Sequence, residues 1–325
     1  MAIEQFDLYG ETAIRVQNEE MEFILVPAWG SNLLSLRLKS KNLELLRFPK
    51  SRELYQADPI LYGLPILFPP NRIADGTFDF NGKKYCFNIN DPLEHNHTHG
   101  LLFDAPWTFL RAEAEGERIV LETIIHSEEH EEIMAQFPHL FTVHMHYILE
   151  QTTLTIEATI SSRDTAPFPW GLGYHTTFNY PFNGSGDHSL CRFSLNADKQ
   201  WVLDERFLPT GELVDIPYLE QLQEGKSLVG HALDDAFQTA KTGANEAVLT
   251  DRGSGICVVY SGDEYFKHWV IYNDDSKQGY LCPEPYTWIT NAPNLQLPEE
   301  LTGFRVLQPG EQVKTTTRIV IEEVV

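Results

Sequence analysis

Alternation of apolar and polar residues is the main pattern along this chain. In Leu34-Ser-Leu-Arg-Leu38 every second residue is leucine, and residues 141–149 and 154–160 alternate in the same way. A period of two places successive side chains on opposite faces, as a half-buried β-strand requires. We therefore predict strands in these stretches, and further strands at residues 118–125, 190–195, 256–260, 268–272 and 317–322.

A hairpin is predicted at residues 77–87. The pair Asn81-Gly82 separates two short apolar-rich runs, Thr77-Phe-Asp-Phe80 and Lys83-Lys-Tyr-Cys-Phe87. Asparagine followed by glycine supplies the two positive φ angles of a type I′ turn, whose twist suits the strands on either side.

Helical periodicity is rare in this sequence. Residues 128–136, ahead of Pro138, predict two helical turns, and residues 219–224 predict one more. Strands separated by Gly, Pro and Asn turns are typical of an all-β fold, here a large antiparallel β-sandwich. Because no internal repeat or linker-like change of composition occurs, we expect residues 1–325 to form a single domain.

Composition and charge narrow the classes of partner. The 325 residues are 42% hydrophobic and carry a formal charge of −23, which disfavours binding to nucleic acid or to an anionic membrane. The N-terminus has no basic and apolar leader, and no apolar run is long enough to span a bilayer. We expect a cytoplasmic protein that binds a small neutral molecule, with monomer and homodimer both open.

The cysteines and the histidine run were considered as metal ligands. The four cysteines are far apart and form no C-x-x-C pair, so a zinc knuckle or redox pair is not expected. His95, His97 and His99 would share one face of an extended strand and could chelate a metal. We favour instead a single ligand-facing histidine, His99, followed by Gly100, which permits close backbone approach.

Five segments carry candidate chemistry. Arg72 follows two prolines that could fix its guanidinium toward hydroxyls, and Asp234 stands ahead of a buried aromatic, Phe237. His175 lies among glycines and aromatic residues in Trp170-Gly-Leu-Gly-Tyr-His-Thr-Thr-Phe-Asn179, and the fourth candidate is His99. The fifth is Glu284, held between two prolines, where partial burial would raise the pKa of a general base toward working pH.

These segments, in this order, resemble the aldose 1-epimerase (galactose mutarotase) family. The matching pieces are Asn71-Arg72-Ile73, His99-Gly100, Gly173-Tyr-His175 with Phe178-Asn179, Asp234 ahead of Phe237, and Glu284-Pro285 running to Asn291-Ala-Pro-Asn294. The resemblance implies a galactose mutarotase-like supersandwich and a reaction that needs no cofactor and no metal, the interconversion of the α and β anomers of a free aldose.

The resemblance also implies roles for individual residues. His175 matches the general acid, Glu284 the general base and His99 a second histidine near the ring oxygen. Arg72, Asn71 and Asp234 match sugar-binding positions. This chain has Tyr174 where the well-characterised members have asparagine, and Leu101 where they often have glycine, so it resembles the broader galactose-mutarotase-like branch.

Three alternatives stay open from the sequence. One is a hexose-6-phosphate mutarotase, which would need a basic cluster beyond Arg72, drawn from Lys83, Lys84, Arg163 or Lys267. The others are a non-catalytic carbohydrate-binding protein on the same fold and a metal-dependent cupin-type isomerase. The pair His144-x-His146 has no assigned role, and its alternation predicts only one exposed strand face.

Overall fold

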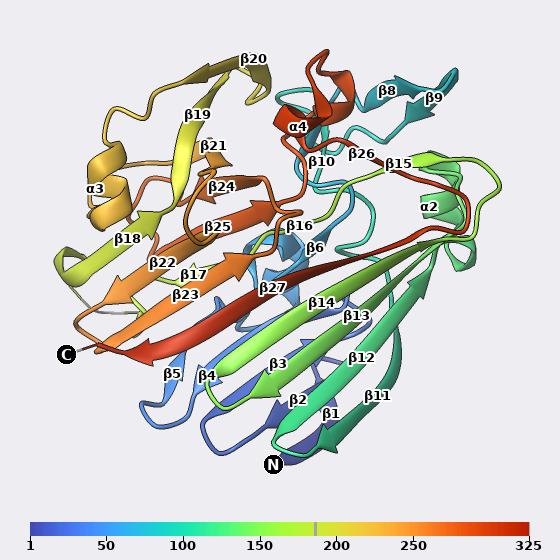
Figure 1. Cartoon of the computed structure of the whole chain (residues 1–325). Helices are drawn as coiled ribbons and strands as arrows, with labels where there is room; N and C mark the ends of the chain where they lie inside the picture. Colours follow the sequence, from blue (N-terminus) through green and yellow to red (C-terminus); the bar gives the residue numbers. More distant parts are fainter. Residues whose placement is uncertain (185–186, 325) are drawn as a thin grey trace.

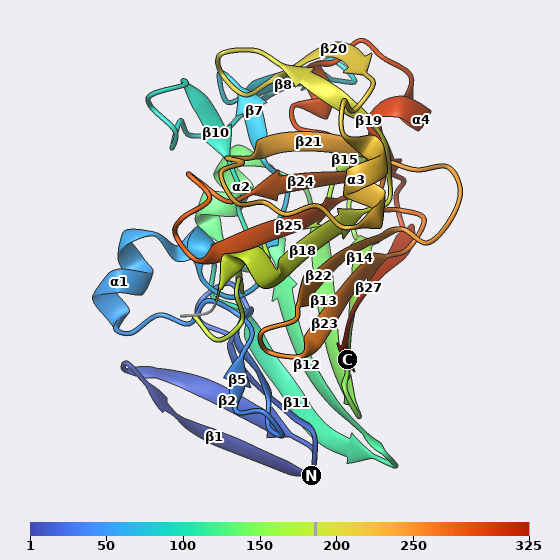
Figure 2. The same cartoon turned by 90° about the vertical axis from the view of Figure 1, so that its left-hand side faces the viewer.

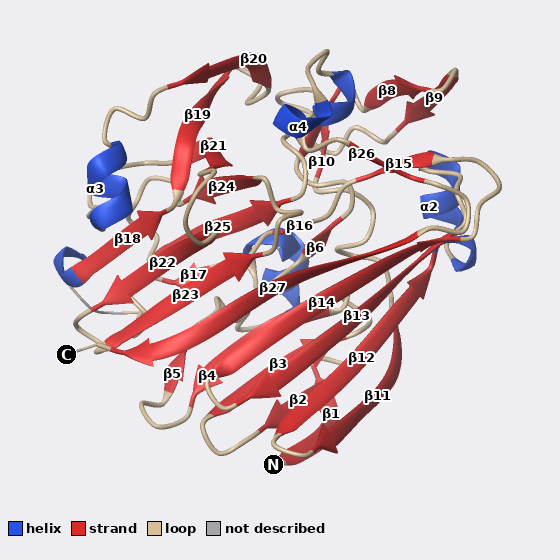
Figure 3. Cartoon of the chain, viewed as in Figure 1, coloured by secondary structure: helices blue, strands red, loops and turns tan. Residues whose placement is uncertain are grey.

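The computed structural model describes residues 1–184 and 187–324 and is built from antiparallel β-sheets (Figures 1 and 3). Eight strands form the large sheet. Their order across the sheet is β11 (Thr108–Glu115), β12 (Arg118–His126), β13 (Phe141–Glu150), β14 (Thr153–Ser162), β27 (Gln312–Glu323), β23 (Ile256–Gly262), β22 (Glu246–Asp251) and β18 (Cys191–Leu195).

A second sheet, which carries Glu284 and Asp234, lies beside the large sheet. Its order is β20 (Pro209–Val214), β19 (Ala197–Leu203), β21 (Asp234–Thr239), β24 (His268–Tyr272), β25 (Tyr280–Tyr286), β16 (Gly173–Tyr174) and β6 (Ile66–Leu67), with β17 (Phe178–Asn179) also paired to β25.

The N-terminal sheet completes the layers. It comprises β1 (Ala2–Leu8), β2 (Glu11–Gln17), β3 (Met21–Val26), β4 (Asn32–Leu38) and β5 (Leu43–Glu44) in sequential order. Figure 2 shows this sheet along one side of β11–β14, with the second sheet above it. Three strand pairs lie outside these sheets: β7 (Arg72–Ala74) with β10 (Asn96–Thr98), β8 (Thr77–Phe80) with β9 (Lys83–Cys86), and β15 (Phe168–Trp170) with β26 (Arg305–Leu307).

Period-two burial explains why the large sheet packs as it does. Along β13 the side chains of Val143, Met145 and Tyr147 are fully buried, whereas His144 and His146 point away from the core and are partly exposed. The Tyr147 hydroxyl donates to the Ser31 carbonyl oxygen at 2.8 Å, which ties β13 to the N-terminal sheet. Each fully buried large side chain contributes about 1.5–3 kcal/mol of transfer free energy.

The strand predictions agree with the structure, and so does the all-β sandwich. The 77–87 hairpin turns through Asn81 (φ 49°) and Gly82 (φ 75°), as a type I′ turn requires.

The helices are short: α1 (Arg52–Ala57), α2 (Glu131–Gln136), α3 (Leu219–Glu224) and α4 (Glu299–Thr302). The region expected to make two helical turns from residue 128 starts as a 3-10 turn at Ser127–Glu129 and becomes α-helical only at Glu131. Among the described residues no helix combines the length and apolar character needed to cross a membrane.

Candidate active site

Glu284 projects from the middle of strand β25 rather than from a loop. Its strand neighbour on one side is Val270 of β24. On the other side β25 pairs with β16 only at Tyr286, and with β17 only at Tyr280 and Leu281. Residues 282–285 therefore have no strand partner on that side, and prolines next to Glu284 remove no hydrogen bond from that ladder.

His175 lies in this gap because the chain no longer pairs with β25 after Gly173. The His175 amide donates to the Pro65 carbonyl at 3.1 Å instead of to β25. A Cβ at Gly173 would come within 2.4 Å of the Tyr286 ring, so glycine is needed for this ring to pack against the strand. The result is that His175 Nε2 lies 3.3 Å from Glu284 Oε1, with both side chains buried.

His99 reaches the same place from the β10 side. Gly100, at φ 74°, forms a bridge with Phe68, and a Cβ there would come within 2.4 Å of the Phe68 carbonyl carbon. The His99 ring packs edge-on against the His175 ring with 5.3 Å between centroids and an angle of 84°. Nδ1 of each ring is buried without a hydrogen-bond partner among the described residues.

The histidines at positions 95, 97 and 99 do not share one face of a strand, so the arrangement that could chelate a metal is absent from these described residues. Only residues 96–98 are extended, and His95 and His99 adopt left-handed backbone conformations (φ 57° and 68°). His95 pairs with Asp75 at the surface, and Nδ1 of His97 donates to the Asn88 carbonyl oxygen at 2.8 Å. Of these three histidines, His99 is the one that lines the cavity around His175 and Glu284.

A chain of hydrogen bonds runs from Arg72 to Glu284. The Arg72 Nη1 donates to Asn71 Oδ1 at 3.2 Å, and Asn71 Nδ2 donates to the Tyr286 hydroxyl at 3.1 Å. The Tyr286 hydroxyl in turn donates to Glu284 Oε2 in a short hydrogen bond. Oε2 is thus held by tyrosine, and Oε1 is the oxygen that faces His175.

Arg72 also forms one wall of the site. Its Nη2 lies 3.4 Å from Asp234 Oδ2, and its guanidinium stacks over the Phe207 ring at 4.8 Å from the centroid. These contacts fix the guanidinium in one orientation at the cavity edge.

The candidate side chains line an open cavity of about 380 Å³. It is lined by Asp58, Ile60, Leu61, Asn71, Arg72, His99, His175, Phe207, Asp234, Val270, Tyr272 and Glu284. All six predicted site residues are in this set, although they come from segments up to 213 positions apart in the sequence, from Asn71 to Glu284 (284 − 71).

Burial controls the protonation of the site. It raises the pKa of Glu284 well above its usual range, against the opposing effect of the Tyr286 hydrogen bond. Burial also lowers the pKa of His175, and it lowers the pKa of His99 well below its usual value together with repulsion from His175 and Arg72. Burial therefore favours a neutral imidazole beside a protonated carboxyl group in this cavity.

Two groups among the described residues bring three potential metal-ligand atoms within 4.8 Å of one another. The first, His175, Cys282 and Glu284, is fully buried, and burial raises the pKa of the Cys282 thiol well above its usual range. A protonated thiol is a poor ligand, so this group is better suited to acid–base chemistry than to metal binding. The second group, Glu122, His144 and His146, lies on the large sheet.

Several cavity residues were not identified from the sequence. The hydrogen bond from Tyr286 was missed, although a residue two positions from Glu284 on one strand faces the same side. Phe207, Tyr272 and Asp58 carry no local signal, because only the fold brings them to the cavity. Tyr174 is fully buried and packs near Phe266, so this departure from the family pattern lies in the core and not in the cavity.

Comparisons with known proteins bear on the family and the fold of this chain. The family model described as Aldose 1-epimerase matches residues 12–320. Galactose mutarotase of Sus scrofa is 25% identical over 207 residues, which cover 62% of this chain but only 57% of that protein. An uncharacterized protein of Escherichia coli, YihR, is 25% identical over 244 residues, covering 73% of each chain.

Solved structures are similar over nearly the whole chain. A galactose mutarotase-like protein from Clostridium acetobutylicum has 30% identity and a TM-score of 0.95, with 99% of both chains covered. Galactose 1-epimerase from Lactobacillus acidophilus has a TM-score of 0.79 at 16% identity, covering 100% of this chain and 99% of that one, and shows the fold alone.

Proposed function

This chain belongs to the aldose 1-epimerase family, and from that premise we propose that it interconverts the α and β anomers of a free aldohexose in the cavity around His175 and Glu284. The observation that carries the proposal is the 3.3 Å separation of His175 Nε2 and Glu284 Oε1 inside a cavity of about 380 Å³. A carboxylate and an imidazole so close together can exchange protons with both oxygens of one hemiacetal carbon.

The reaction needs two proton transfers in each direction. In the proposal Glu284 removes the proton from O1 while His175 protonates the ring oxygen, and the C1–O5 bond breaks to give the open aldehyde. Rotation about C1–C2 turns the other face of the carbonyl toward O5. The ring then closes as His175 takes back the O5 proton and Glu284 returns its proton to the former carbonyl oxygen.

The proton count of the pair suits this cycle. A carboxylate with an imidazolium and a carboxyl group with a neutral imidazole contain the same number of protons. The first state starts ring opening and the second accompanies the open-chain sugar, so the pair alternates between them without exchange with solvent. Burial favours the second state before sugar binds, and the hydrogen bond from Tyr286 to Oε2 favours the carboxylate that the first state needs.

The other predicted residues fit binding roles around this pair. His99, partly buried and with its pKa lowered well below the usual value, would hydrogen-bond the ring-oxygen side of the sugar. Arg72 and Asp234 would hold hydroxyl groups at the cavity edge, and Asn71 would act through Tyr286 and Arg72.

The charge around the cavity favours a neutral sugar over a phosphorylated one. Of the described residues that line it, Arg72 is the one cation, against the carboxyl groups of Asp58, Asp234 and Glu284. Arg163, a cation considered for the phosphate, instead pairs with Glu128 outside the cavity. A dianionic phosphate would need more positive charge than Arg72 supplies.

Polarimetry of freshly dissolved α-D-glucose and α-D-galactose near pH 7 tests the proposal. Mutarotation also proceeds unaided, so the measured quantity is acceleration over a buffer blank. We expect acceleration with at least one of these sugars. Acceleration only with glucose 6-phosphate would favour the phosphorylated substrate, and calorimetric sugar binding without any acceleration would favour a binding protein.

A further inference from the structure

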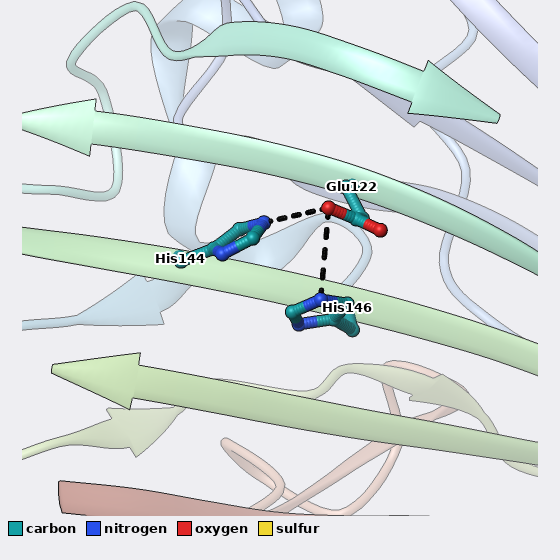
Figure 4. A group of neighbouring side chains, drawn as sticks. All are labelled: Glu122, His144 and His146. Carbon is teal, nitrogen blue, oxygen red and sulfur yellow. Dashed lines mark hydrogen bonds and ion pairs between the residues drawn. The ribbon is translucent and has the colours of Figure 1, made fainter.

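A group of two histidines and one glutamate lies on the face of the large sheet that points away from the core (Figure 4). Glu122 of β12 stands directly opposite His146 of β13, and His144 is two residues along the same strand. Glu122 Oε2 lies 2.9 Å from His144 Nε2 and 3.6 Å from His146 Nε2. The two imidazole rings are 4.2 Å apart between centroids.

These separations suit a bound transition-metal ion. Two ligand atoms at about 2.0–2.1 Å from one tetrahedral ion lie about 3.3 Å apart. The observed 2.9 and 3.6 Å bracket that distance, so small side-chain rotations would place all three atoms around one ion. Because the three residues stand on two paired strands, the backbone already fixes their spacing.

The surroundings prepare Glu122 and the histidines to act as ligands. Arg111 Nε and Nη2 contact the other glutamate oxygen, Oε1, at 2.8 and 2.5 Å, so that Oε2, which is hydrogen-bonded to His144 Nε2, is the oxygen that faces the two imidazoles. Arg111 is itself paired with Glu113 at 2.7 Å and Glu115 at 3.4 Å, and these carboxylates offset its charge.

The histidines also have free capacity and access to solvent. Nδ1 of His146 is buried without a hydrogen-bond partner in the described part of the chain. The side chains are 28% (His144) and 26% (His146) exposed, so an ion can reach the ring nitrogens and water can complete its coordination.

We propose that Glu122, His144 and His146 form a binding site for one divalent transition-metal ion, with Zn²⁺ the best-matched cation. Zn²⁺ binds imidazole and carboxylate ligands together, whereas Mg²⁺ and Ca²⁺ prefer sites made of oxygen ligands. None of the three residues lines the cavity around His175 and Glu284, so the site is separate from the proposed epimerase reaction.

Zinc titration of the metal-free, full-length protein by isothermal calorimetry, with metal analysis after dialysis, tests this site. We expect one equivalent of Zn²⁺ in the wild type, and affinity at least about tenfold weaker in Glu122→Gln and in the double variant His144→Asn/His146→Asn. The matched control His95→Asn/His231→Asn removes two exposed histidines elsewhere and should bind as the wild type does.

Two further readouts keep the test decisive. Co²⁺ added in place of Zn²⁺ should give visible absorption bands that disappear in the His144→Asn/His146→Asn variant, while circular dichroism shows that the variant stays folded. Sugar mutarotation should be the same with Zn²⁺ and with a chelator. Undiminished Zn²⁺ binding by the folded double variant, or no binding by the wild type, would overturn the proposal.

Discussion

Tyr286 and Glu284 stand two residues apart on β25, and the tyrosine hydroxyl donates to the carboxyl oxygen that does not face His175. The two oxygens of Glu284 therefore have different environments: Oε2 is anchored and Oε1 faces His175. This arrangement holds the carboxyl group in one orientation, with Oε1 available for proton transfer.

The first prediction concerns the two proton-transfer residues. Glu284→Gln and His175→Asn should each lower kcat by about 10²–10⁴-fold, because each removes one acid–base partner and keeps a similar shape. Polarimetry gives the rate, and circular dichroism establishes that each variant is folded. Wild-type rates in either folded variant would contradict the assigned roles.

The second prediction concerns the anchor of Glu284. Tyr286→Phe removes a hydrogen bond that lowers the pKa of Glu284, so that pKa should rise further. The alkaline limb of the pH profile of kcat/KM should then move to higher pH, because the His175–Glu284 pair in its one-proton state loses that proton from the carboxyl group. Tyr174→Phe is a matched control, since Tyr174 is also fully buried but its hydroxyl has no partner among the described residues. A shift of the same size in both variants would argue against the Tyr286 contact as its cause.

The third prediction concerns sugar binding by Arg72. Replacing it by methionine keeps an unbranched side chain but removes the charged donor, and hydrogen bonds to charged groups are worth about 1.5–3 kcal/mol. We expect KM to rise by about tenfold or more, with a smaller change in kcat. Arg163→Met, which removes an exposed cation paired with Glu128, should leave KM unchanged. An unchanged KM in Arg72→Met would remove Arg72 from the binding site.

The sequence predicted the long strands and the site residues, but not how they meet. Strands such as β13 and β14 are half-buried along their whole length, so their period of two is visible in the sequence. The two-residue strands β6, β16 and β17 are too short to show any period, yet they create the gap in which His175 meets Glu284. That contact depends on strand register across 109 residues (284 − 175), which local pattern does not encode.

The last prediction concerns stability and Glu44, a partly buried glutamate on β5. Burial raises its pKa to about 7 although it accepts hydrogen bonds from Ser35 and Leu36. Because the folded-state pKa lies above the unfolded value of 4.5, the folded state binds this proton more tightly. The resulting stability is complete below pH 4.5 and is lost as the pH rises toward 7, by about 3 kcal/mol at 1.36 kcal/mol per pH unit.

Glu44→Gln mimics the protonated side chain at every pH and isolates this effect. Urea unfolding at several pH values should show that the variant gains stability relative to the wild type between pH 4.5 and pH 7, with little difference at the acidic end. Glu53→Gln is a suitable control, because Glu53 is exposed and its pKa is lowered rather than raised, so its removal should produce no such gain. A constant difference between Glu44→Gln and the wild type across this range would show that Glu44 titrates alike in the folded and unfolded chains.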